Sequence, residues 1–136
     1  MSHFSTIKTR IIDHSCLIQA LKKLNYSIEE NSEIKGYNGR VRKGDIVIKT
    51  SGSFDIGFVK SIKDGSFQIV ADWYAGNITR SIGKSRSNFI NEVQKEYSVF
   101  KILHEMRKKG YRIKSREIID ETGEIKLVIV KRGYSR

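Results

Sequence analysis

The feature that most constrains this fold is an Asp64-Gly65 pair that separates two short apolar segments. Residues 54–59 alternate between large apolar side chains and polar or small ones, and residues 67–73 form a second, more continuous apolar run. An Asp-Gly pair in this position is a strong signal for a two-residue hairpin turn, because type I′ turns need positive φ angles. The sequence therefore predicts two adjacent antiparallel strands in the middle of the chain.

Apolar residues at spacings of three and four predict two helices. The first covers residues 14–24 and begins after Asp13, whose carboxylate can accept an unpaired backbone N–H of the first turn. The second covers residues 86–109 and ends before Gly110, a residue type that commonly follows the last turn of a helix. This second helix has the strongest periodicity in the chain, which runs through Phe89, Val93, Tyr97, Phe100 and His104.

Shorter alternating runs predict the remaining strands, at residues 3–12, 26–30, 45–49, 111–119 and 124–131. Residues 31–44 contain three Gly and two Asn, and they are interpreted as a loop or a loosely formed hairpin. Residues 75–86 are interpreted as a connection. Because hairpins dominate the middle and the end of the chain, we expect an α+β fold with a largely antiparallel sheet and two helices packed on one face. A length of 136 residues suits a single domain over residues 1–136.

The composition excludes several classes of protein. The longest uncharged run, residues 14–21, is far shorter than the roughly 20 residues of a membrane-spanning helix, so no membrane insertion is expected. The first ten residues lack the apolar core of a secretion signal. A single cysteine, Cys16, excludes an intrachain disulfide and a zinc site with four cysteine ligands, and it indicates a reducing compartment.

The net charge of +11 is distributed unevenly along the chain. Residues 35–43 hold four basic and no acidic residues, whereas residues 44–78 hold three basic and four acidic residues. Residues 101–136 hold eleven basic and five acidic residues. The first segment and the 75–86 connection predict a surface for a partner or a polyanion, made of Lys35, Tyr37, Arg40, Arg42, Lys43, Arg80, Lys84 and Arg86.

Three interpretations of this charge stay open. Basic groups interleaved with aromatic rings can bind phosphates and stack bases, which favours RNA or DNA binding. The same surface could instead hold a protein partner, or it could be a solvated face rich in lysine. The chain has no ribonucleoprotein aromatic motif and no Cys/His finger.

A candidate ligand edge lies in the predicted central hairpin. Asp55 and Asp72 fall on its two strands and could meet across the sheet, where two carboxylates could share a proton or a cation. Trp73 follows Asp72 directly and could complete the edge of a small enzyme or ligand-binding module. The structural alternative is a core tryptophan beside a carboxylate that binds a turn N–H. No GxSxG, Walker, GxGxxG or paired-histidine motif is present, so we expect no enzyme, cofactor or metal site.

Several segments together form a more specific pattern over nearly the whole chain, at residues 1–9, 28–31, 36–37, 54–58, 70–73 and 123–128. In this order they resemble the hypothetical chloroplast open reading frame 35 family. The resemblance implies a plastid location, or the cytoplasm of a cyanobacterium-like cell, and it implies no biochemical mechanism. The composition agrees with an A/T-rich genome such as that of a plastid, because there are 20 Ile against 5 Leu, 3 Ala and no Pro.

These observations lead to an expected function. We expect a soluble, plastid-encoded protein of the stroma that acts as a non-enzymatic accessory or assembly factor, most readily by binding another protein. RNA or DNA binding through the basic loops is the alternative. A small enzyme or ligand-binding module near Asp55, Asp72 and Trp73 is the second alternative. The sequence leaves the identity of the partner and the oligomeric state open.

Overall fold

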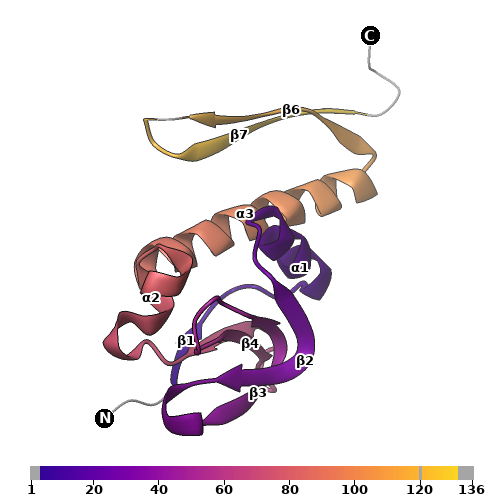
Figure 1. The fold of residues 1–136 in the computed structure, drawn as a ribbon. Helices are drawn as coiled ribbons and strands as arrows, with labels where there is room; N and C mark the ends of the chain where they lie inside the picture. Colours follow the sequence, from indigo (N-terminus) through magenta and orange to yellow (C-terminus); the bar gives the residue numbers. More distant parts are fainter. Residues whose placement is uncertain (1–3, 120, 132–136) are drawn as a thin grey trace.

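The computed structural model describes residues 4–119 and 121–131, which form a curved antiparallel sheet, a set of helices and a separate C-terminal hairpin (Figure 1). The predicted α+β class is confirmed. In chain order the elements are β1 (Ser5–Lys8), α1 (His14–Lys23), β2 (Ile28–Lys35), the 3₁₀ turn η1 (Tyr37–Gly39), β3 (Val41–Ile48), β4 (Ile56–Lys60), β5 (Phe67–Ala71), the 3₁₀ turn η2 (Tyr74–Gly76), α2 (Asn77–Ile82), α3 (Arg86–Lys108), β6 (Tyr111–Ile119) and β7 (Glu124–Lys131).

The main sheet has five strands in the order β1-β5-β4-β3-β2, and all neighbouring strands are antiparallel. Strands β4 and β5 form the predicted central hairpin, with Phe58 opposite Ile69. Strand β1 pairs along the other side of β5, where Ser5 lies opposite Ala71. The four strands from β2 to β5 are therefore a meander, and the first strand of the chain completes its edge.

The turn of the central hairpin is longer than the predicted two-residue turn. Residues 61–66 connect the two strands, and within the Asp64-Gly65 pair the positive φ belongs to Gly65 alone, at 76°. The Asp64 carboxylate instead accepts the backbone N–H of Ser66 at 2.9 Å. The Asp-Gly signal thus located the turn correctly, whereas its length follows from this local hydrogen bond.

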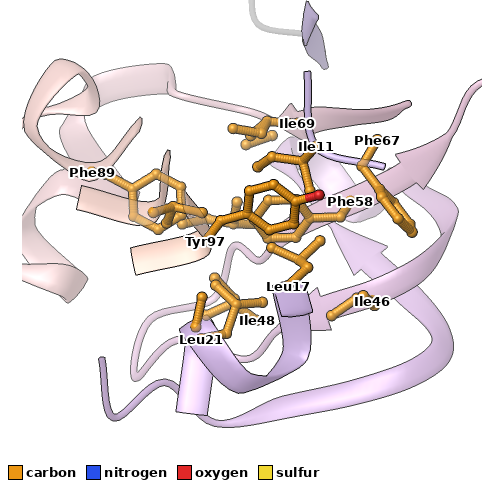
Figure 2. Close-up of a cluster of buried hydrophobic side chains, with 14 of the residues drawn as sticks. Ile11, Leu17, Leu21, Ile46, Ile48, Phe58, Phe67, Ile69, Phe89 and Tyr97 are labelled. Carbon is orange, nitrogen blue, oxygen red and sulfur yellow. The ribbon is translucent and has the colours of Figure 1, made fainter. Parts of the chain in front are cut away.

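Helices α1 and α3 cover one face of the main sheet, as predicted. Leu17 from α1 and Phe89 from α3 are fully buried against Phe58 of β4 (Figure 2). The Tyr97 hydroxyl accepts the backbone N–H of Asp13 at 3.0 Å, which ties α3 to the start of α1. The core therefore needs segments from both halves of the chain.

The far end of β2 folds over the other face of the sheet. Ile34 is fully buried there in a second, smaller core with Val47. Gly57 makes the space for it, because a Cβ at this position would collide with the Ile34 side chain. Beyond β2, Gly36 lies against the ring of Phe4, which precedes β1. The two edges of the sheet thereby approach each other, as in a partly closed barrel.

Two segments have more regular structure than the sequence predicted. Residues 31–44 were expected to be a loop or a loose hairpin, but they continue β2 and β3, with Ser32 opposite Gly44. The pattern is weak because this extension buries a single large side chain, Ile34, on one face. The connection at 75–86 contains η2 and the six-residue helix α2.

The strands β6 and β7 form a separate two-stranded sheet that lies on α3 (Figure 1). Both strands were predicted, and the structure places them apart from the main sheet. Arg116 of β6 reaches the buried carboxylate of Glu96 on α3 at 2.7 Å. An isolated two-stranded hairpin has marginal stability in water, so its packing against α3 is required. The apolar stripe predicted along α3 ends before His104, which is exposed.

Helix α1 begins after Asp13, as predicted, and this residue provides a first test of the fold. Its carboxylate accepts the backbone N–H of Cys16 at 2.9 Å. Replacing Asp13 by alanine should lower the free energy of unfolding by about 1 kcal/mol, because an N–H of the first turn loses its acceptor. Urea denaturation at neutral pH measures this loss. Asp13→Asn should retain most of the stability, because the amide oxygen still accepts the bond.

The hydrogen bond from Cys16 to Asp13 also predicts that the stability of the fold depends on pH. The hydrogen bond from Cys16 and the nearby Lys101 lower the pKa of Asp13 below its ordinary value of 3.8, against the opposing effect of partial burial. The ionised carboxylate therefore stabilises the fold above pH 3.8, and this stabilisation is lost as the pH falls through the lower folded-state pKa. The difference in the free energy of unfolding between the wild type and Asp13→Ala should therefore become smaller as the pH falls below 3.8. A difference that stays constant with pH would contradict the role of the ionised Asp13 carboxylate as the helix cap.

Candidate functional site

The structure brings two basic segments together through a pair of tyrosine rings. Tyr37 begins η1 inside the basic segment 35–43, and Tyr74 begins η2 just before α2. Their ring centroids lie 4.9 Å apart, with the ring planes inclined by 54°. Tyr37 is 43% exposed and Tyr74 is 45% exposed, so each side chain remains open to solvent. The pair is therefore a surface feature and does not belong to either core.

One buried carboxylate holds the backbones of both tyrosines. Asp72 is 1% exposed, and its Oδ2 atom accepts the backbone N–H of Tyr37 at 3.0 Å. Its Oδ1 atom accepts the backbone N–H of Tyr74 at 3.1 Å. Hydrogen bonds to an ionised acceptor are stronger than those between neutral groups. Asp72 therefore fixes the position of one tyrosine relative to the other.

Asp55, which lies just before β4, binds the segment that leads to Tyr37. It is 4% exposed, and its Oδ2 atom accepts the backbone N–H of Lys35 at 2.9 Å and the Lys49 amine at 3.1 Å. The backbone N–H of Asp55 in turn donates to the carbonyl of Lys35 at 2.9 Å. Asp55, just before β4, and Asp72, just after β5, thus both bind the segment 35–37. Their partners in the structure are backbone groups and a lysine of this chain.

Three exposed cations lie in the segments around the two tyrosines, within six residues of one ring or the other. Lys35 and Arg40 line a hollow of about 430 Å³ that also contains Ser53. Arg80 lies on α2, and its Nη1 atom donates to the carbonyl of Ala75 at 2.7 Å, one residue beyond Tyr74. We use the name basic tyrosine surface for five of these residues, Lys35, Tyr37, Arg40, Tyr74 and Arg80.

Two of the other predicted basic residues donate hydrogen bonds within the fold. The Lys84 amine donates to both carboxylate oxygens of Glu92, at 2.5 and 2.6 Å, and to the Tyr26 hydroxyl at 2.9 Å. Burial opposes the charge on Lys84, but these bonds outweigh it and the pKa of Lys84 is raised. The Lys43 amine donates to the carbonyl of Asn31 on β2 at 3.1 Å. The charge of Lys84 is therefore paired with an acid of this chain, whereas Lys43 remains an exposed cation on β3.

The predicted ligand edge is divided between the two faces of the sheet. Trp73 packs toward α3, where its ring centroid lies 6.3 Å from that of Phe89. The Arg86 guanidinium lies 5.9 Å from the Trp73 ring centroid, so this predicted surface residue is placed against the tryptophan. Asp72 points to the opposite side and binds Tyr37. The structure therefore does not bring Trp73 together with the two carboxylates. Arg42 is exposed on β3.

Tyr74 is the residue of this surface that the sequence patterns missed. The sequence does contain a pattern that could have indicated Tyr74, because the chain has no acidic residue between Asp72 and Glu92. The acid-free region therefore starts directly at Trp73, before the predicted cluster at Arg80, and it includes Tyr74.

Metal ligands, a reactive thiol and membrane-spanning helices are other features common in functional sites. Among residues 4–119 and 121–131, no group of three His, Cys, Asp or Glu side chains could hold a metal ion. Cys16 is buried in the main core, and burial raises the pKa of its thiol. Within these residues the structure contains no helix that is both long and apolar enough to cross a membrane.

Comparison with known proteins gives the family. A family model described as a protein of unknown function, DUF1257, matches residues 20–128. This chain belongs to the DUF1257 family. Similar proteins include the uncharacterized protein ycf35 of Cyanophora paradoxa, which is 30% identical over 98% of this chain and 100% of its own length. The uncharacterized protein ycf35 of Guillardia theta is 32% identical over 95% of this chain and 96% of its own length. No solved structure matches the chain significantly.

The family confirms the resemblance found in the sequence. The name ycf35 denotes a hypothetical chloroplast reading frame, and these relatives come from plastid genomes. The DUF1257 match at residues 20–128 includes every residue of the basic tyrosine surface. The surface thus lies within the segment that matches the family model.

Proposed function

We propose that this DUF1257 protein is a non-enzymatic accessory or assembly factor that binds another macromolecule through the basic tyrosine surface. One observation carries the proposal. A single buried carboxylate, Asp72, joins two basic segments that are distant in sequence into one exposed surface around Tyr37 and Tyr74.

The charge of this surface favours a binding role. Residues 35–43 contain four basic and no acidic residues, and residues 73–91 contain three basic and no acidic residues. Exposed tyrosine and arginine side chains are enriched where proteins bind partners. A surface that combines both, without balancing acids in either segment, suits a partner that carries negative charge.

The two carboxylates support the non-enzymatic part of the proposal. A general base needs a free carboxylate within reach of a substrate. Asp55 and Asp72 are both buried, and each accepts two hydrogen bonds from groups of this chain. Their geometry therefore suits the anchoring of residues 35–37.

The stroma is the proposed place of action. The relatives from plastid genomes support this location, and the cytoplasm of a cyanobacterium-like cell is the corresponding alternative. Immunoblotting of fractionated plastids from the source organism tests it, and recovery of the protein in another compartment would contradict it.

A comparison of two charge-reversal variants tests the function. Tagged wild-type protein and Lys35→Glu/Arg40→Glu are used to capture partners from plastid extract, followed by mass spectrometry. Both side chains are exposed, so the variant should remain folded. We expect recovery of the partner to fall about tenfold or more, because like charges then face each other across the interface.

The matched control is Lys60→Glu/Lys63→Glu, which changes the net charge equally. These exposed lysines lie at the other end of the central hairpin from Tyr74. The control variant should recover the partner as well as the wild type does. Equal recovery by all three proteins would refute the proposed surface, and equal losses in both variants would mean that only net charge matters.

A further inference from the structure

The basic tyrosine surface combines two exposed aromatic rings with exposed cations. We propose that it binds single-stranded nucleic acid, with bases stacked on Tyr37 and Tyr74. The phosphates are held by Lys35, Arg40 and Arg80. This inference rests on the proposed function, because it names the partner of the same surface.

The two rings supply the stacking surface. Because their planes are inclined by 54°, they do not cover each other face to face. Both side chains also keep more than two-fifths of their area exposed, at 43% and 45%. Aromatic rings displayed in this way bind unpaired bases by stacking, and they do so with little dependence on base identity. The pair can therefore accept neighbouring bases of one strand.

The rings are also held in place before any ligand arrives. Asp72 binds the backbone N–H groups of Tyr37 and Tyr74, and each tyrosine begins a 3₁₀ turn. Asp55 fixes Lys35, two residues before Tyr37, through the N–H and the carbonyl of Lys35. A preorganised surface loses less conformational entropy on binding. The buried carboxylates thereby contribute to affinity without touching the ligand.

The combination of cations and exposed rings favours a single strand over an acidic peptide or a duplex. A peptide of acidic residues would satisfy the cations but would leave the two exposed rings without an aromatic partner. A duplex would offer phosphates, but its base faces are hidden by pairing and stacking. A single strand presents both phosphates and free base faces, so it is the partner that uses Lys35, Arg40 and the tyrosine pair together.

Fluorescence anisotropy with a labelled uridine-rich RNA of about 12 nucleotides tests the inference. The stacking variant is Tyr37→Leu/Tyr74→Leu, which keeps apolar bulk and removes the aromatic faces. Its affinity should fall roughly 30-fold or more, because both stacked bases lose their aromatic partner. A DNA strand of the same sequence and the corresponding duplex are measured in parallel, so that RNA, DNA and duplex binding are distinguished.

The salt dependence separates the role of the cations from that of the rings. Each phosphate contact on a single strand contributes about −0.7 to the slope of log affinity against log salt. Lys35→Gln/Arg40→Gln should therefore make the slope less steep by about 1.4. The tyrosine variant and a Lys60→Gln/Lys63→Gln control should both keep the wild-type slope.

Three results would overturn the inference: no RNA or DNA binding at low salt, tighter binding of the duplex than of the single strand, or wild-type affinity in Tyr37→Leu/Tyr74→Leu. The proposed function has a separate readout. If a protein partner is still captured from nuclease-treated extract and its recovery depends on Lys35 and Arg40, the proposed function stands and this inference fails.

Discussion

Replacing Gly57 by valine should lower the free energy of unfolding by about 3 kcal/mol, near the upper end of what overpacking a core costs. Any Cβ at this position collides with the side chain of Ile34, which is fully buried. Gly57 lies in the central strand β4, between Val47 of β3 and Val70 of β5, so the backbone cannot move aside. Urea denaturation followed by circular dichroism measures the loss.

Two further variants test whether the cost of Gly57→Val comes from its collision with Ile34. Gly39 has a φ of 73° and no neighbour within 4 Å, so Gly39→Ala should cost only the backbone strain, about 1–2 kcal/mol. Ile34→Ala alone should cost about 2–5 kcal/mol, because it leaves a cavity. Combined with Gly57→Val, it should cost less than the sum of the two single changes, since the cavity accepts the valine. Strict additivity would show that the two residues do not interact.

Replacing Asp72 by alanine should lower the free energy of unfolding by about 2–3 kcal/mol, because two backbone N–H groups lose their acceptor. It should also release Tyr37 from Tyr74, since the carboxylate binds the N–H groups of both. Urea denaturation measures the first effect. Amide chemical shifts of the two tyrosines measure the second, and both amides should shift together. RNA affinity should fall as well, although Asp72 itself is 1% exposed.

Asp72→Asn and Asp45→Ala serve as comparisons. The asparagine keeps one acceptor oxygen but turns an N–H₂ donor toward the second backbone N–H. The stability of Asp72→Asn should therefore lie between that of the wild type and that of Asp72→Ala. Asp45 is half-buried and accepts one backbone N–H, that of Lys60 at 2.7 Å. Because water can take the place of this carboxylate, Asp45→Ala should lower the free energy of unfolding by less than Asp72→Ala does. A fully stable Asp72→Asn, with unshifted tyrosine amides, would contradict the anchoring role.

The elements that the sequence predicted well are those that local interactions determine. The cap at Asp13, the periodic stripe that contains Phe89 and the Gly65 turn each depend on a few neighbouring residues. The extension of β2 and β3 was missed because its stability comes from elsewhere. Ile34 is buried by packing over Gly57, which is distant in sequence, and polar residues surround it in the chain.

The candidate site shows the same division. The segment 35–43 was identified from its charge, which is a property of the sequence alone. Its junction with Tyr74 depends on Asp72, which binds Tyr37 across 35 positions of the chain. The role of Lys84 was hidden for the same reason, because one of its partners, Tyr26, is 58 positions away. Charge patterns locate basic segments, and long-range hydrogen bonds decide which of them face the same side.

The pairing of β1 with β5 has a consequence for synthesis on the ribosome. Ser5 leaves the exit tunnel long before Ala71, its partner in the sheet, has been translated. The meander from β2 to β5 can assemble hairpin by hairpin as it emerges, whereas the first strand has to wait unpaired. Helix α3, which covers the same core, is translated later still. The core can therefore close only after the residues of α3 have been translated.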